Sequence, residues 1–452
     1  MPTPPTPPPQ PTLPTELTDA IIDHLAQADG GGGDWRALAA CARVSPRWRE
    51  RAGFWLARGG VRLSLARRGR ERASDGKGEG EEGDLEDFLQ QFRTGPAGLA
   101  ELVGALTLDG AAGGAKSGLS SGGAGYHYLS DADVRRVARG GLRNVRALTL
   151  KRVCVGSAES LRALYTGGGF GRLEELALED VVIDTSISSQ EGQPDRVEPP
   201  SAEHALTYTY PPLKAVRLRA RAPADPGTRS AVDELRDDLR APALAATVRS
   251  LKVDVSRGDM EGWAETLVAL QGGLEELRVR VWPQPAGART ALYAAIGGCA
   301  RLRRLALHFS SGIQLAHSES VVVCGSVADW LSSTSGAEEG GGRAGRVLFA
   351  RGLEEFTLCV AYPVSTLGFR REAVLRVGRA LGRERYPALR VVRVNVLDRG
   401  EGDESEEERE TMRRDVEEGI AAEQSGRERG LGGAVVQVRV VGQGEQWTSE
   451  CI

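Results

Sequence analysis

The sequence predicts an α/β fold in which a short all-α N-terminal segment precedes an irregular solenoid of helix–strand repeats, with a curved parallel sheet and outer helices. A short apolar pattern recurs after residue 85, and segments with helical periodicity lie between its copies. The residues before it carry apolar positions at helical spacing instead. With 452 residues, the chain is long enough for a small module and a repeat array.

The recurring pattern is an apolar residue, two variable residues, a second apolar residue, one variable residue and a third apolar residue. Its last two apolar positions alternate as in a β-strand, and the first reaches the same core from the preceding turn. Ten copies occur, at Val103/Leu106/Leu108, Val145/Leu148/Leu150, Leu173/Leu176/Leu178, Leu213/Val216/Leu218, Val248/Leu251/Val253, Leu274/Leu277/Val279, Leu302/Leu305/Leu307, Leu353/Phe356/Leu358, Leu389/Val392/Val394 and Val435/Val438/Val440. We therefore expect ten short strands, each with one buried face.

Segments with helical periodicity separate many of these copies, and each of them precedes a strand pattern. They cover residues 131–139, 158–165, 231–239, 262–270, 290–296, 326–331 and 371–381. Because one helix and one strand cannot bury both of their faces alone, neighbouring repeats must stack into a parallel sheet with the helices outside. We expect that sheet to curve, since a helix is wider than a strand.

The pattern resembles that of leucine-rich repeats, although its copies are 26 to 51 residues apart and regular repeats span about 20 to 29 residues. We therefore expect disordered insertions at about 110–125, 185–201, 333–345 and 400–405. Regular repeats also carry an Asn three residues after the last Leu. The only two asparagines, Asn144 and Asn395, do not occupy that position, which predicts an array without an asparagine ladder.

Composition also divides the chain into segments. Residues 1–12 are mostly proline and predict a disordered tail, and residues 13–66 form a first compact segment with its connection. A polar, Gly-rich stretch at 67–84 predicts a flexible linker that separates the first segment from the repeats. The array then covers 85–441, and 442–452 is a C-terminal tail.

The first compact segment carries two apolar stripes at helical spacing. Pro14 suits the first turn of a helix, Glu16 suits its positive N-terminal end, and Leu17, Ile21 and Leu25 repeat every four residues. A second stripe contains Leu38, Cys41, Val44 and Trp48. A unit of about 40 residues cannot hide this much apolar surface internally, so we expect it to bind a partner.

These residues resemble the F-box pattern, in which L-P-x-E-L opens the first helix and V-S-x-x-W follows in the second half. The matching positions are Leu13, Pro14, Glu16, Leu17, Ile21, Ile22 and Leu25, then Leu38, Cys41, Val44, Ser45, Arg47 and Trp48. A Gly-rich insertion at 30–33 departs from the pattern between the helices. The resemblance implies the substrate-recognition subunit of an SCF-type cullin-RING ubiquitin ligase, which binds a Skp-type adaptor, and through it a cullin, while its repeats bind a target protein.

Within that resemblance, the residues implied to bind the adaptor are Leu13, Pro14, Glu16, Leu17, Ile21, Ile22, Leu25, Leu38, Cys41, Val44 and Trp48. Two other interpretations remain open. The chain could be an F-box scaffold with no role in ubiquitination, or the helices could form a cap that shields the end of the repeat array.

Composition and motifs indicate a non-catalytic protein. The net charge of -4 gives no broad reason to expect nucleic acid or a membrane as partner, and the six scattered cysteines predict reduced thiols in the cytosol or nucleus. No apolar stretch reaches the about 18 residues of a membrane span, and no signal peptide is indicated. The chain lacks metal, P-loop and dinucleotide motifs, so we expect no cofactor and no catalytic residues.

Two weaker signals have ordinary explanations. A G-x-S-x-G match at 118–122 lies in a low-complexity loop, whereas a catalytic serine of that type needs a strand before it and a helix after it. The acidic run at 401–410 surrounds Ser405, a candidate phosphorylation site, but such runs are usually solvated surface.

Overall fold

The computed structural model describes residues 13–27, 35–58, 60–65, 85, 88–91, 100–110, 126–139, 142–166, 170–185, 210–220, 228–255, 259–281, 286–309, 317–333, 348–362, 375–382, 385–398, 410–411, 414 and 435–441. The chain divides into two compact units, and we describe each by itself. The first contains Met1–Pro211 and Ala224–Arg229, and the second contains Pro212–Pro223 and Ser230–Ile452.

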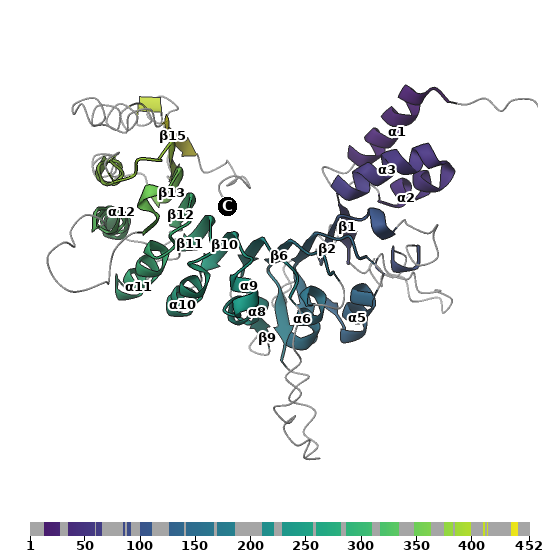
Figure 1. Ribbon diagram of the computed structural model, residues 1–452, viewed down its shortest axis with the longest axis horizontal. Coiled ribbons are helices and arrows are strands. Elements are labelled where there is room, and N and C mark those ends of the chain that lie inside the picture. The colour runs from purple at the N-terminus through teal and green to yellow at the C-terminus, as the bar shows by residue number, and fades with distance from the viewer. Residues whose placement is uncertain are drawn as a thin grey trace, which may run out of the picture. The chain divides into compact units, whose positions relative to one another are not determined.

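The first unit begins with three helices and continues with short parallel strands and further helices (Figure 1). Its helices are α1 (Thr15–Gln27), α2 (Trp35–Val44), α3 (Pro46–Arg58), η1 (Ala100–Leu102), α5 (Asp131–Arg139) and α6 (Ala158–Tyr165). Its strands are β1 (Val61–Ser64), β2 (Ala105–Asp109), β3 (His127–Leu129), β4 (Ala147–Lys151), β5 (Val153–Val155), β6 (Glu175–Glu179) and β7 (Val182–Asp184). Strands β1, β2, β4 and β6 form one sheet in that order, and β3, β5 and β7 form a second.

The second unit alternates helices with parallel strands, which lie in the order β8, β10, β11, β12, β13, β14 and β15. Its strands are β8 (Ala215–Arg219), β9 (Thr228–Ser230, at the boundary of the units), β10 (Ser250–Val255), β11 (Glu276–Val281), β12 (Arg304–Phe309), β13 (Glu355–Tyr362), β14 (Val391–Asp398) and β15 (Val435–Val441). Its helices are α8 (Ala231–Leu239), α9 (Pro242–Ala245), α10 (Met260–Leu270), α11 (Ala286–Gly297), α12 (His317–Ser332) and η4 (Leu348–Arg351). Figure 1 shows α10, α11 and α12 on the same face of these strands.

The predicted α/β class is confirmed, and each of the ten apolar patterns falls on a parallel strand. The patterned positions lie opposite one another across adjacent strands, as in the series Leu251, Leu277, Leu305 and Phe356, all of which are buried. The tenth copy is the exception. Val436 pairs with Val392, so that copy was placed two residues too late, and its second apolar position lies at 436 rather than 438.

One additional strand of the same kind was not predicted. In β1, Val61 and Leu63 are buried and pair with Leu106 and Leu108, so they occupy the last two positions of the apolar pattern. The first position of that copy is Arg58, which hides the pattern. The strand lies in the stretch that was predicted to be only a connection between the first helices and the array.

The second sheet of the first unit was also missed, because its strands have only three residues each. The chain turns into β5 through Arg152 and towards β7 through Asp180, whose φ angles are 52° and 55°. This left-handed backbone conformation is uncommon outside glycine and allows a sharp change of direction. A strand of three residues carries too few alternating positions to be recognised by periodicity.

Charged side chains join neighbouring repeats of the second unit at the positions that precede each strand. The sign alternates across the strands at Arg249, Glu275, Arg303, Glu354 and Arg390. Arg249 Nε lies 3.9 Å from Glu275 Oε1, and Arg303 Nη1 lies 3.6 Å from Glu354 Oε1. One residue further along these strands, Arg304 Nη2 lies 3.2 Å from Glu276 Oε2. Exposed ion pairs of this kind contribute little stability each, so their main effect is to match the register of adjacent repeats.

Asparagine links repeats at one place in the first unit. Asn144 Nδ2 donates to the carbonyl oxygen of Glu101 at 2.8 Å, and its Oδ1 accepts from Arg172 Nη1 at 3.0 Å. These three residues occupy the turns before β2, β4 and β6. Asn395 instead lies within β14, directly after Val394, so neither asparagine lies three residues after the last apolar position of its repeat.

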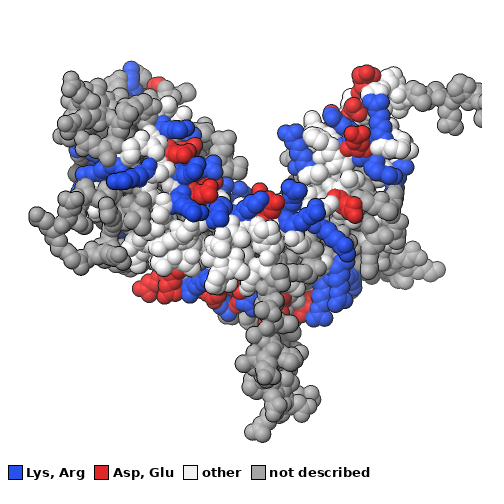
Figure 2. Space-filling model, in the orientation of Figure 1, with Lys and Arg blue, Asp and Glu red and all other residues white. Residues whose placement is uncertain are grey.

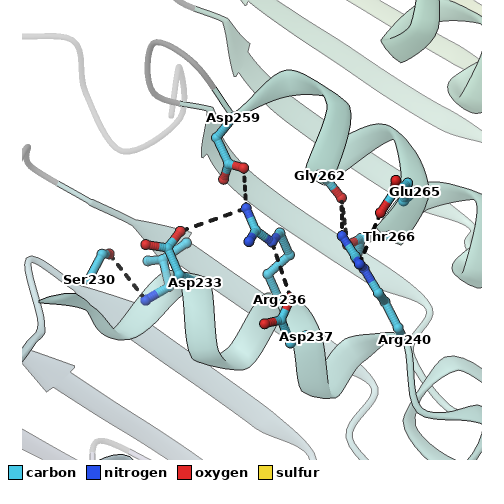
Figure 3. Close-up of polar contacts among 10 residues, drawn as sticks. Ser230, Asp233, Arg236, Asp237, Arg240, Asp259, Gly262, Glu265 and Thr266 are labelled. Atoms are coloured by element: carbon cyan, nitrogen blue, oxygen red, sulfur yellow. Dashed lines mark hydrogen bonds and ion pairs between the residues drawn. The ribbon is translucent and has the colours of Figure 1, made fainter.

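Two arginines of α8 hold that helix against α10 (Figure 3). Arg236 forms an ion pair with Asp259, directly before α10, while Arg240 Nη2 donates to the carbonyl oxygen of Gly262 at 2.9 Å. Arg240 Nη1 also lies 3.0 Å from Glu265 Oε2. The N-terminus of α8 is capped by Ser230, whose Oγ accepts from the backbone N–H of Val232 at 3.2 Å.

Most of the predicted helices are confirmed, three of them with the predicted bounds: α5, α6 and α8. The segment expected at 371–381 is helical from residue 375 to residue 380, and residues 371–374 lie outside the described residues. The tails, the linker at 67–84, the interiors of the four insertions, the G-x-S-x-G match and Ser405 lie outside the described residues. Curvature of the sheet stays a prediction.

Candidate protein-binding surface on the N-terminal helices

Local sequence defines the ends of the first three helices. The carbonyl oxygen of Pro14 accepts from the backbone N–H of Thr18 at 3.1 Å, so Pro14 directly precedes the first turn of α1. Ser45 separates α2 from α3, and its Oγ accepts from the backbone N–H of Trp48 at 3.3 Å. Pro46 then begins α3, because proline favours the first helical position and excludes its preceding residue from helical geometry. Trp48 therefore lies on α3, whereas the sequence placed it on one stripe with Leu38, Cys41 and Val44.

The three helices pack against one another (Figure 1) and enclose a small apolar core. Of the residues implied to bind the adaptor, Ile22, Leu38 and Cys41 belong to this core. They are joined there by Ala52 and Leu56 of α3. These side chains hold the helices together, and they are not accessible to a partner in this arrangement.

Four of the other predicted residues are large apolar side chains that stay exposed. Leu17 and Ile21 lie four residues apart and form one stripe along α1, Leu13 lies two residues before that helix begins, and Val44 ends α2. Their exposed fractions are 52%, 40%, 57% and 63% respectively. Burying an apolar side chain stabilises a protein by roughly 1.5–3 kcal/mol, so a stripe left in water by folding is a candidate contact surface.

The remaining predicted residues lie around this stripe. Pro14 and Glu16 are exposed, while Leu25 and Trp48 are half-buried. The structure adds Phe54 of α3, which is exposed and lies below the guanidinium groups of Arg51 and Arg58, each 5.6 Å from its ring centroid. Five of the eight large apolar side chains exposed in the described part of the chain therefore belong to this small bundle: Leu13, Leu17, Ile21, Val44 and Phe54.

A polar contact fixes α1 on α3. Trp55 Nε1 donates to Asp23 Oδ1 at 2.7 Å, and Arg51 Nε donates to the same oxygen at 2.7 Å. The Arg51 guanidinium is the main reason that the pKa of Asp23 is lowered, and burial opposes this effect. Sequence spacing could not reveal this contact, because the partners are 28 and 32 residues apart. The contact of Asp23 with Arg51 and Trp55 orients α1, the helix that carries the exposed stripe.

The bundle contacts the first repeat directly. Gly104 lies so close to α3 that a Cβ atom there would be 2.5 Å from the carbonyl oxygen of Ala57, and a Cβ atom on Gly53 would be 3.1 Å from Leu102. Phe88 also packs edge-on against Trp35 of α2, with ring centroids 5.1 Å apart. The helices and the first strands thus form one compact unit, where the sequence predicted a separate module.

A second polar cluster lies on adjacent strands of the second unit, where His308, Cys359 and Asn395 are register partners. Cys359 Sγ lies 3.9 Å from His308 Nε2 and accepts from Asn395 Nδ2 at 3.3 Å. Burial, together with Arg278 and Arg280, lowers the pKa of His308 to about 3, so its imidazole is neutral at pH 7. A reactive thiolate needs a cationic neighbour and access to solvent, whereas Cys359 is fully buried. This cluster is a packing contact and not a nucleophile.

In the part of the chain that the structure describes, no three His, Cys, Asp or Glu side chains gather where they could hold a metal ion. None of its helices is both long enough and apolar enough to cross a membrane.

Comparison with known proteins finds no family model that matches the chain and no matching curated sequence. The resemblance to the F-box pattern therefore rests on the residues themselves and on their places in α1, α2 and α3.

Proposed function

We propose that the chain is the substrate-recognition subunit of an SCF-type cullin-RING ubiquitin ligase. Helices α1 to α3 act as the F-box that binds a Skp-type adaptor, and the helix–strand repeats form an irregular leucine-rich-repeat-like solenoid that binds a target protein. The chain supplies no catalytic residue. Its contribution is to hold the target near the ubiquitin carrier, which raises the effective concentration of the reacting groups.

The observation that carries this proposal is the exposed stripe of Leu17 and Ile21 on α1, together with exposed Leu13 just before the helix. The same three residues belong to the L-P-x-E-L half of the F-box pattern, where the resemblance implies adaptor contact. Folding of the bundle has buried other apolar residues, such as Ile22 and Leu56, and has left these outside. A stripe of this kind fits a helical partner, which would place its own apolar side chains between the turns of α1.

A helical cap on the repeats is the second candidate, and the contact of α3 with Gly104 and Leu102 favours it. A cap explains why Gly53, which lies against Leu102, is buried. It does not explain the stripe, because a terminal cap protects an array by presenting a polar outer face. Both descriptions hold together if the bundle covers the first repeat with α3 and binds the adaptor with α1.

The test is binding of the full-length chain to a purified Skp-type adaptor, measured by isothermal titration calorimetry. We expect a stoichiometric complex. The same complex is then combined with cullin, RING protein and ubiquitin carrier. Ubiquitin conjugates formed in that assembly support the receptor function, and an adaptor complex that forms none identifies a scaffold. A chain that folds but binds no adaptor is a capped repeat protein, and the proposal fails.

A further inference from the structure

A row of basic side chains crosses three adjacent strands in the second unit. Arg217 of β8 is the register partner of Lys252 of β10, which is the partner of Arg278 of β11. Each lies between two buried residues of its own strand, so the row faces away from the aliphatic core. Figure 2 shows blue side chains gathered over the strands of this unit, with red ones between them.

The row differs from the columns that precede the strands. In those columns arginine and glutamate alternate, so each cation faces an anion on the next strand. Along the row, three cations follow one another directly, an arrangement that destabilises a sheet. The requirements of the fold therefore do not account for the row, which points to a role in binding.

Lys252 lies at the centre of this row and is half-buried. Burial lowers its pKa, and Arg278, Arg217 and Arg304 lower it further, while Glu276 acts in the opposite direction. Glu276 is shared, because its carboxylate lies 3.0 Å from Arg278 Nε and 3.2 Å from Arg304 Nη2. On the other side of the row, Arg280 Nη1 lies 3.6 Å from Asp254 Oδ2. The local surface thus carries five cations and two carboxylates.

We propose that this row, with Arg304 at its side, is the docking site for an acidic segment of a partner protein, whose Asp and Glu carboxylates lie over Arg217, Lys252 and Arg278. Adjacent strands are about 4.8 Å apart, so the row extends over about 10 Å. That length matches two or three carboxylates of an extended chain, whose side chains on one face recur about every 6.8 Å. Arginine and lysine together bind such groups through charge-assisted hydrogen bonds.

A protein segment fits this surface better than a nucleic acid does. Proteins that bind single strands combine basic grooves with exposed aromatic side chains on which bases stack. The row positions on the next two strands are Ala306 and Thr357, so the row offers no aromatic platform there. Glu276 and Asp254 at its edges would also repel a continuous phosphate backbone, whereas a peptide can place uncharged residues over them.

The identification of this acidic segment as part of a ubiquitination target rests on the proposed receptor function, although binding itself does not. The probe is a fluorescein-labelled peptide of ten glutamates, with ten glutamines as the uncharged control, measured by fluorescence anisotropy with the full-length chain. We expect saturable binding of the glutamate peptide at about 50 mM salt that weakens at about 500 mM, since screening shortens the reach of charges. The glutamine peptide is expected not to bind.

The variant Arg217→Gln with Lys252→Gln tests the row itself. Loss of two charge-assisted contacts is expected to weaken binding of the glutamate peptide about tenfold or more. Two matched changes on α5 of the first unit, Arg135→Gln with Arg139→Gln, remove the same charge from exposed positions and should leave binding within about twofold. Equal affinity of the two variants overturns the proposal, as does tighter binding of an oligodeoxythymidine of ten nucleotides.

Misfolding is not expected to cause the loss of peptide binding in this variant. Replacement of Lys252 removes a charge that burial and its neighbours disfavour, so the variant is expected to unfold at the same temperature as the wild type or at a higher one. Adaptor binding by the same variant separates the two proposals. Retained adaptor binding with lost peptide binding supports the docking site, while adaptor binding that is absent in every variant contradicts the receptor function alone.

Discussion

The N-terminal helices and the strands of the second unit bury the same kind of side chain but expose different kinds. Inside both regions lie aliphatic residues, such as Ile22 of α1 and Leu277 of β11. Outside, α1 presents Leu17 and Ile21, whereas β10 and β11 present Lys252 and Arg278. The buried positions are explained by folding in each case. The exposed ones carry the functional information, because neither set improves the stability of the isolated chain.

Two neighbouring residues of α1 differ most clearly in role, because one is part of the core and the other belongs to the exposed stripe. Ile22 is fully buried, so Ile22→Ala is expected to lower the free energy of unfolding of the helical bundle by about 2–5 kcal/mol. Ile21→Ala should change it by less than about 0.5 kcal/mol, because the side chain is exposed. Urea denaturation followed by tryptophan fluorescence measures both. Equal destabilisation by the two changes would show that the stripe is part of a core.

The contact between the helices and the first repeat is tested at Gly104. A Cβ atom there would lie 2.5 Å from the backbone oxygen of Ala57, so Gly104→Ala is expected to cost about 1–3 kcal/mol as α3 moves away from β2. The matched control is Gly171→Ala, which meets nothing within 4 Å and should be neutral or slightly stabilising. Both are compared by thermal denaturation. If Gly104→Ala is as stable as the control, the bundle is independent of the repeats.

Charged Lys252 in the basic row is expected to destabilise the folded chain, whereas the residues of the apolar core stabilise it. Because the pKa of Lys252 is lowered in the folded state, the unfolded chain binds more protons between that value and 10.5. The wild type should therefore gain stability as the pH rises through this window, and Lys252→Gln should remove that gain. Midpoint temperatures at pH 7 and pH 10 measure it. A lower midpoint for the variant at pH 7 would indicate that Lys252 stabilises the sheet.

The smallest effect is expected at Asp23, which orients α1. Its pKa is lowered below 3.8 by Arg51 and Trp55, so the stabilisation is fully present above pH 3.8 and is lost as the pH falls through the folded-state value. Asp23→Asn should flatten the acid limb of the stability curve between about pH 2 and 4. Glu16→Gln, at an exposed carboxyl of the same helix, is the control. Identical acid limbs in the wild type and Asp23→Asn would rule out this contact in solution.

Periodicity predicted the repeats well because their buried positions are local in sequence. Nine copies of the pattern lie in phase, while the tenth was misplaced because Val435, Val436, Val438 and Val440 offer two overlapping matches. Strand β1 was hidden by Arg58 at the first position of its copy. Chain-distant contacts, such as those of Phe88 with Trp35 and of Gly104 with Ala57, leave no trace in spacing. This is why the bundle was predicted to be separate from the array.

The binding surface was predictable only in part for the same reason. The F-box pattern identifies a set of residues but does not say which of them face outward, since packing of α1 on α3 decides that. It includes buried Ile22 and Cys41 together with exposed Leu17, and it omits Phe54. The basic row could not be recognised before the register was known, because Arg217, Lys252 and Arg278 belong to three repeats.

The central claim is that α1 binds a Skp-type adaptor through its exposed stripe. Calorimetric titration of the adaptor into Leu17→Ala with Ile21→Ala tests it most directly, with Val268→Ala, an exposed apolar residue on α10, as the control. The double variant should fold like the wild type and bind at least about a hundredfold more weakly, since each central apolar contact contributes at least 1–2 kcal/mol. The control should bind normally. Unchanged affinity of the folded double variant would contradict the account.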